Sequence, residues 1–123
     1  MIDKQIEEML RQHLPDRATD TLACYEAFKH DDWKDLDEEG NLKGFVSYFF
    51  LDFTHDMLIT AANNNTFSKT HFKVVKDTVL NRDRPLRISA DQNKKILHKL
   101  VEKYGGKFFE GEIWFREPGE SYV

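Results

Sequence analysis

The chain has 123 residues, of which 40% are hydrophobic, 13% aromatic and 33% charged, and its formal net charge is −4. This length predicts one globular domain over residues 1–123. No apolar run approaches the ~20 residues of a membrane span, and the acidic, amphipathic start is unlike a signal peptide. We therefore expect no membrane partner. The single cysteine, Cys24, excludes an internal disulfide and favours a cytoplasmic location.

The charge is distributed unevenly along the chain. Residues 1–62 carry 6 basic and 14 acidic side chains, whereas residues 63–123 carry 12 basic and 8 acidic ones. The acidic half argues against general nucleic-acid binding, and the basic half could meet a small anionic ligand or an acidic partner. Two solvated faces of opposite sign explain the pattern equally well.

Apolar periodicity and turn signals predict the order helix, helix, strand, strand, strand, helix, strand, helix, strand. The expected elements are helices over residues 2–14 and about 20–28, strands over 33–36, 42–53 and 57–62, a helix over 68–81, a strand over 86–90, a helix from Asp91 to Gly105, and a strand over 107–115. Residues 117–123 are expected to form a loose tail.

The order of these elements predicts the fold class. Hairpins come first and strand–helix–strand units follow, which is typical of a mixed sheet with helices on both faces. The nearly continuous apolar run over residues 45–51 is typical of a central strand that is covered on both faces. We therefore expect an α/β (α+β) domain with about five strands and about four helices.

The closing stretch, RISADQNKKILHKLVEKYGGKFFEGEIWF, carries a further pattern. It reads as a strand, an Asn that opens a helix, a Gly after the helix and an aromatic strand. This ending and the element order over residues 2–116 are similar to the GNAT (GCN5-related N-acetyltransferase) superfamily, and most like the small degenerate GNAT-like proteins of tailed bacteriophages. Asn93 and Gly105 stand at the family's Asn and Gly. The family's first strand has no counterpart.

The resemblance implies where acetyl-CoA would bind. The family grips the pyrophosphate at the start of its third helix with a glycine-rich loop, and the corresponding stretch here, NNNTFS, has no glycine. Side chains there hinder the close approach of backbone N–H groups to a phosphate. The cofactor-binding residues that the resemblance implies are Asn65, Thr66, Phe67, Ser68, Lys69, Lys73 and Asn93. Leu100 stands where many family enzymes have a Tyr that protonates the leaving thiolate.

Two further residues are catalytic candidates. Asp52 and His55 lie in LDFTHDM, the connection between two predicted central strands. A carboxylate and an imidazole close together could deprotonate an amine or bind a metal, although the spacing matches no defined metal motif. A polar turn in which His55 caps a strand end is the alternative.

These observations lead to two hypotheses about function. The joint absence of the glycine signature and the Tyr favours a non-catalytic bacteriophage accessory or assembly protein, which needs no cofactor and binds a phage or host protein in the host cytoplasm or the virion. The alternative is an acyl-CoA-dependent N-acetyltransferase with an atypical, glycine-free pyrophosphate loop. A nucleic acid would contact the basic side between residues 69 and 87, but it is an unlikely partner.

Overall fold

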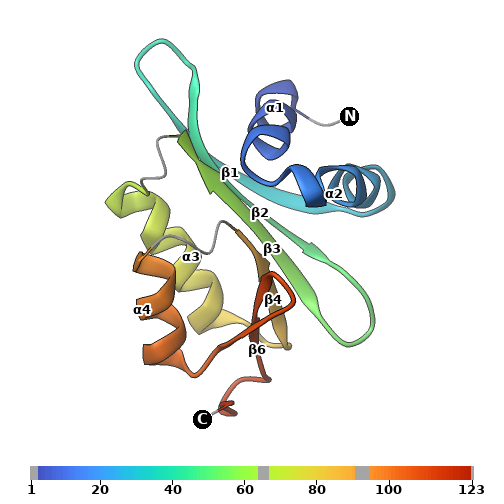
Figure 1. Ribbon diagram of the computed structural model, residues 1–123, viewed down its shortest axis with the longest axis vertical. Helices are drawn as coiled ribbons and strands as arrows, with labels where there is room; N and C mark the ends of the chain where they lie inside the picture. Colours follow the sequence, from blue (N-terminus) through green and yellow to red (C-terminus); the bar gives the residue numbers. More distant parts are fainter. Residues whose placement is uncertain (1–2, 64–66, 91–94, 123) are drawn as a thin grey trace.

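The computed structural model describes residues 3–63, 67–90 and 95–122, which contain four α-helices and six β-strands (Figure 1). In chain order they are α1 (Lys4–His13), α2 (Pro15–Ala27), β1 (His30–Leu36), β2 (Leu42–Phe50), β3 (Asp56–Ala62), α3 (Lys69–Asn81), β4 (Leu86–Ser89), α4 (Lys95–Tyr104), β5 (Lys107–Phe109) and β6 (Glu112–Phe115). The predicted α+β class is confirmed, with one strand more than expected near the end of the chain.

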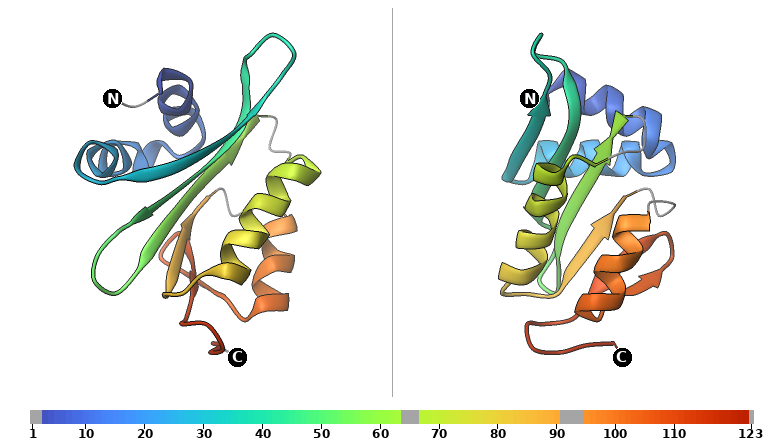
Figure 2. Two further views of the ribbon diagram at one scale, coloured as in Figure 1. Left: turned by 180° about the vertical axis from the view of Figure 1, so that it is seen from behind. Right: turned by 90° about the vertical axis from the view of Figure 1, so that its left-hand side faces the viewer.

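The six strands form one mixed sheet in the order β1-β2-β3-β4-β6-β5. β3 and β4 pair in parallel, and the other neighbouring pairs are antiparallel. A parallel pair needs a crossover connection, which α3 provides. α1 and α2 lie on one face of the sheet, and α3 and α4 lie on the other (Figures 1 and 2).

The central strand β3 is buried along its whole length. Successive side chains of a strand point to opposite faces. Met57 and Ile59 accordingly join the apolar cluster that contains Ile6 of α1, whereas Leu58 joins the cluster that contains Val75 of α3. The sheet is therefore covered on both faces at its centre, which explains the continuous apolar sequence of its middle strands.

The junction between the first two helices differs from the prediction. A second helix beginning near residue 20 is wrong, because α2 begins at Pro15. Pro15 ends α1 and also occupies the first turn of α2, where a backbone N–H is not needed. Asp3 caps α1 by accepting hydrogen bonds from the N–H groups of Gln5 and Ile6 at 2.8 and 3.3 Å.

The end of the chain also differs from the prediction. Residues 107–115 are a hairpin rather than one strand, and Glu110 and Gly111, with φ of 48° and 81°, make the turn between β5 and β6. The described part of the tail is anchored rather than loose, because the N–H of Tyr122 donates to the carbonyl of Gly105 at 3.1 Å.

β3 continues beyond its parallel neighbour. β4 pairs with Asp56 through Ile59 of β3, whereas Thr60 and Ala62 have no described strand beside them on that side. β3 therefore extends beyond the described pairing with β4, at the end from which the chain continues to α3.

Candidate functional site

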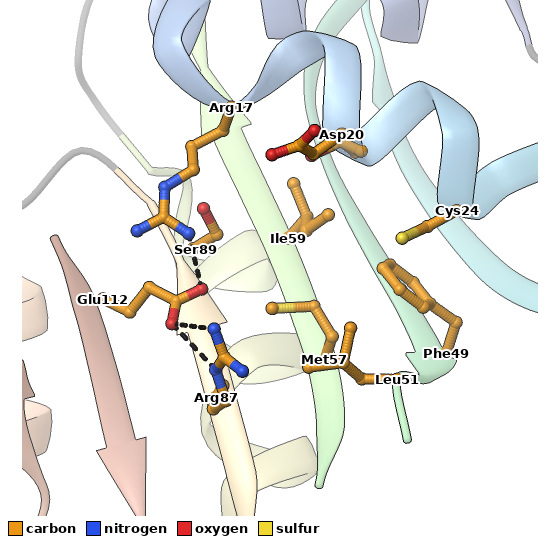
Figure 3. Close-up of a pocket in the computed structure, with 11 residues that line it drawn as sticks. Arg17, Asp20, Cys24, Phe49, Leu51, Met57, Ile59, Arg87, Ser89 and Glu112 are labelled. Carbon is orange, nitrogen blue, oxygen red and sulfur yellow. Dashed lines mark hydrogen bonds and ion pairs between the residues drawn. The ribbon is translucent and has the colours of Figure 1, made fainter. Parts of the chain in front are cut away.

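A pocket of about 200 Å³ lies between α2 and the sheet (Figure 3). One wall is apolar and consists of Phe49, Leu51, Met57 and Ile59 from β2, β3 and the turn between them. This volume suits one small apolar group, and such a wall favours an occupant with a hydrocarbon part.

The opposite end of the pocket is polar. Arg87 and Ser89 come from β4, Glu112 comes from β6, and Arg17 and Asp20 come from α2 (Figure 3). Strand alternation explains this grouping, because Arg87 and Ser89 are two residues apart and point to the same face. The antiparallel neighbour β6 pairs Trp114 with Arg87, which brings the side chain of Glu112 to that face as well.

Two arginines hold the carboxylate of Glu112. Arg17 Nη1 donates to Glu112 Oε2 at 2.8 Å, and Arg87 Nε and Nη2 approach Glu112 Oε1 at 2.8 and 2.6 Å. The Trp114 indole N–H donates to the same Oε1 at 3.2 Å. Glu112 is only 1% exposed, so burial of its charge depends on these donors. The carboxylate is therefore committed to these partners rather than to a ligand.

Ser89 differs from the other polar residues of the pocket. Ser89 is 2% exposed, and its Oγ has no hydrogen-bond partner among the described residues. An unpaired buried hydroxyl is costly, and most such groups in folded proteins are satisfied by protein atoms or water. Ser89 Oγ therefore offers a hydrogen bond to whatever occupies the pocket.

Cys24 provides little nucleophilic chemistry at the pocket. Burial, and secondarily the negative charge of Asp20, raises the pKa of the Cys24 thiol above its usual value. The thiolate is the reactive form, so a raised pKa keeps this cysteine inert near neutral pH. The pocket as a whole is suited to binding a small group, with hydrogen bonding at Ser89, rather than to acid–base or nucleophilic chemistry.

The catalytic candidates Asp52 and His55 do share one turn, between β2 and β3. Asp52 Oδ1 accepts from the N–H and the hydroxyl of Thr54 at 2.8 and 2.7 Å, and from the N–H of His55 at 2.8 Å. These hydrogen bonds, the Thr54 hydroxyl foremost, lower the pKa of Asp52 to about 2. Asp52 therefore closes the turn as an ionised carboxylate, which makes it a weak base.

The ring of His55 contacts Thr54 and Trp114. Its Nδ1 lies 2.8 Å from Thr54 Oγ1, and its ring packs edge-on against Trp114 at 5.0 Å between centroids. Burial lowers the pKa of His55, so the imidazole is mostly neutral at pH 7. The guanidinium of Arg87 also lies over the Trp114 ring, 4.8 Å from the ring centroid. His55 therefore lies beside Trp114, near Arg87 and Glu112, and far from the start of α3.

Part of the implied cofactor set lies at the start of α3. Ser68 caps the helix, and its Oγ accepts from the N–H of His71 at 3.0 Å. Lys69 is exposed, and Lys73 is exposed and paired with Asp77 at 2.9 Å. Phe67 stacks on His71 with 4.1 Å between ring centroids. Asn65, Thr66 and Asn93, which complete the predicted set, lie outside the described residues.

His71, in the first turn of α3, lies in the core. It is fully buried, and its Nε2 lies 2.6 Å from Thr60 Oγ1 on β3. Trp33 packs against its ring at 5.3 Å between centroids. Gly44 leaves the room for this packing, because a Cβ there would lie 2.6 Å from His71 Nδ1. His71 therefore joins α3 to the sheet.

The pocket residues were not predicted from sequence. The alternation in LRIS does place Arg87 and Ser89 on one face of a strand, but no local signal brings Arg17 and Glu112 together. These two residues are joined by tertiary structure alone, between α2 and the hairpin at the end of the chain.

No protein-family model matches this chain, and a search of curated proteins finds no related sequence. Among residues 3–63, 67–90 and 95–122, no group of three or more His, Cys, Asp or Glu side chains is arranged to hold a metal ion. No described helix is both long enough and apolar enough to span a membrane.

Proposed function

We propose that this chain is a bacteriophage accessory or assembly protein with a GNAT-like fold, which is non-catalytic and acts by protein–protein contact. One observation carries the non-catalytic part. Asp52 and His55 lie before the first residue of β3, and Ser68 and Lys69 follow its last residue. β3 has seven residues, which at about 3.3 Å each separates the two groups by roughly 20 Å.

This separation argues against a catalytic arrangement of the predicted residues. A general base must lie within hydrogen-bond reach of the proton that it removes, next to the acyl group under attack. Leu100, at the position of the family's general acid, is 1% exposed and packs in the apolar core under α4. The candidate bases and the position of the family's general acid thus have structural uses in this chain.

The GNAT-like part of the proposal is supported by topology. The chain has two helices, then a three-strand meander, then α3, β4, α4 and a final antiparallel pair. β3 and β4 are the parallel neighbours, and β3 extends beyond the described pairing. The bacteriophage origin is proposed from the resemblance of the closing segment, and it implies a location in the host cytoplasm or the virion.

The proposal is tested by asking whether the chain binds a protein. The full chain, immobilised through a terminal tag, is exposed to lysate from phage-infected host cells. We expect one phage or host protein to be retained, and the complex of the two purified proteins to survive gel filtration. A chain that stays monomeric and retains no protein above the level of a bare-resin control contradicts the proposal.

A second function is favoured by two observations. The chain continues from β3 to α3, whose first residue, Lys69, is exposed, and Ser89 Oγ offers a hydrogen bond in the pocket beside β4. In an acyl-CoA-dependent N-acetyltransferase, Lys69 and the N–H groups at the start of α3 would hold the cofactor's phosphates. Acetyl-CoA would supply the activated acyl group. Release of free thiol from acetyl-CoA in the presence of a panel of primary amines would support this alternative.

A further inference from the structure

The two edges of the sheet differ in how open they are to another strand. β5, at one edge, has only three residues, and a tight turn ends it. β1, at the other edge, has seven residues, and its pairing with β2 is regular from His30 to Asp35, with the register shift only after Asp35. Short strands and bulges are the usual means by which proteins block an edge. β1 has neither over most of its length.

The outer side of β1 pairs with no other strand among the described residues. β1 forms the outer border of the sheet (Figure 2, right), and no residue in the described ranges hydrogen-bonds to the outward backbone groups of residues 30–35. Such a row of N–H and C=O groups is a template to which an extended segment can add as a further strand.

The charges along β1 select the kind of strand that can add. Asp31 and Asp32 are exposed, and the turn after β1 adds Asp37, Glu38 and Glu39, which are exposed as well. Three cations lie nearby: Lys29 is exposed just before β1, Lys34 Nζ lies 2.9 Å from Asp3 Oδ2, and Lys43 Nζ lies 3.7 Å from Asp35 Oδ1, so the acidic side chains outnumber them. The edge therefore carries an excess of negative charge.

This excess disfavours a second copy of the chain. An antiparallel pair of β1 strands centred on Trp33 would bring Asp31 of one copy opposite Asp35 of the other, which is destabilising. Lys34, which would lie opposite Asp32, is already paired with Asp3. A basic strand would instead place cations beside these carboxylates. The edge is thus protected against self-pairing and complementary to a segment of opposite charge.

Strand alternation gives the pattern of that segment. Trp33 pairs with Val46 and packs on His71, so it faces α3, and Asp31 and Asp35 are two residues to either side on the same face. Trp33 is only half-buried and can cover one more apolar side chain. The complementary strand has a basic residue, any residue, an apolar residue, any residue and a basic residue.

We infer that β1 is a docking edge for an extended basic segment of a partner protein, which adds antiparallel or parallel to β1 and places an apolar side chain beside Trp33 between cations at Asp31 and Asp35. This inference rests on the proposed function, since it names where the protein contact is made.

The test uses the full chain and the synthetic peptide acetyl-Lys-Thr-Val-Thr-Lys-amide, followed by NMR. We expect saturable shifts concentrated in residues 30–36, and slower hydrogen exchange of β1 amides. A peptide of the same sequence with every backbone nitrogen methylated keeps both charges but has no N–H donors. It should not bind. Equal binding of the methylated peptide overturns the inference. Shifts spread over α1 and α2 overturn it as well.

Charge reversal provides the matched variants. Asp31→Lys with Asp35→Lys should weaken the peptide about tenfold or more, and the peptide acetyl-Glu-Thr-Val-Thr-Glu-amide should bind this variant instead. Asp16→Lys with Glu26→Lys makes the same change in net charge at exposed positions on α2 and should leave binding unchanged. Equal weakening by both variants overturns the inference, as does a dimer with β1 at its contact.

The outcomes separate this inference from the proposed function. If a protein partner binds the chain and the β1 variant equally well, the proposed function stands and the docking edge is wrong. If the peptide adds to β1 but no protein is retained from lysate, the edge stands and the proposed function fails.

Discussion

At the scale of single residues, the unusual feature is the contrast between two buried serines. Ser47 and Ser89 are both on strands and are 0% and 2% exposed. Ser47 Oγ donates to Asp32 Oδ1 at 2.7 Å, whereas Ser89 Oγ has no partner in the described part of the chain. A buried hydroxyl that stabilises nothing internally is one that the fold alone does not require.

Alanine substitutions test this contrast. Ser47→Ala should lower the free energy of unfolding by about 1–2 kcal/mol, because a hydrogen bond to a charged group is lost. Ser89→Ala should change it by less than about 0.5 kcal/mol, or raise it. Urea denaturation of both variants at neutral pH measures the difference. An equal loss of stability in the two variants would show that Ser89 has an internal partner.

The carboxylate of Asp52 makes the stability of the folded chain depend on pH in the acid range. Its pKa is lowered to about 2 in the folded chain from an ordinary value of 3.8. A depressed pKa contributes stability that is fully present above the unfolded value and is lost as the pH falls toward the folded value. Asp52→Asn should therefore be less stable than wild type at pH 6, and the two should converge between about pH 4 and pH 2.

Thermal unfolding followed by circular dichroism across this pH range measures the effect. Asp31→Asn is the control, because Asp31 is exposed on β1 and accepts no hydrogen bond from a described residue. A gap between Asp52→Asn and wild type that stays constant down to pH 2 would contradict the turn-closing role of the carboxylate.

At the scale of elements, Arg17 connects parts of the chain that lie far apart in sequence. From α2 it reaches Glu112 on β6, and its Nη2 donates to the carbonyl of Glu110 in the hairpin turn at 2.8 Å. The helical periodicity of residues 4–27 predicts that two helices exist, but it contains no information about this contact. The Glu-Gly turn at Glu110 and Gly111 was likewise missed, because apolar residues continue on both sides of it and resemble one strand.

The contribution of this contact is measured with a pair of arginine variants. Arg17→Met keeps much of the side-chain volume but loses both contacts, and should lower the free energy of unfolding by about 1–2 kcal/mol. Arg11→Met removes only the exposed pair with Glu7 on α1, at 3.3 Å, and should cost less than about 0.5 kcal/mol. Equal effects in urea denaturation would mean that Arg17 contributes no more than a surface ion pair.

At the scale of the whole molecule, the order of elements followed from periodicity because each buried face leaves a local pattern in the sequence. Val75 and Val79 mark the buried face of α3, and Gly105 ends α4 with a φ of 74°. The site was less predictable, because it depends on which strands become neighbours. Arg87 and Glu112 meet only because β6 returns beside β4. The burial of His71 likewise depends on Gly44, which makes room for it from a strand 27 positions earlier in the chain.

The proposed non-catalytic role predicts that the chain does not bind acetyl-CoA, and calorimetric titration with acetyl-CoA measures this binding. We expect no saturable heat with ligand up to about 1 mM, where a binding free energy of roughly −4 kcal/mol would still be detected. Saturable heat that is abolished by Lys69→Glu but retained in Lys99→Glu, an exposed lysine of α4, would contradict the claim. It would favour the acetyltransferase instead.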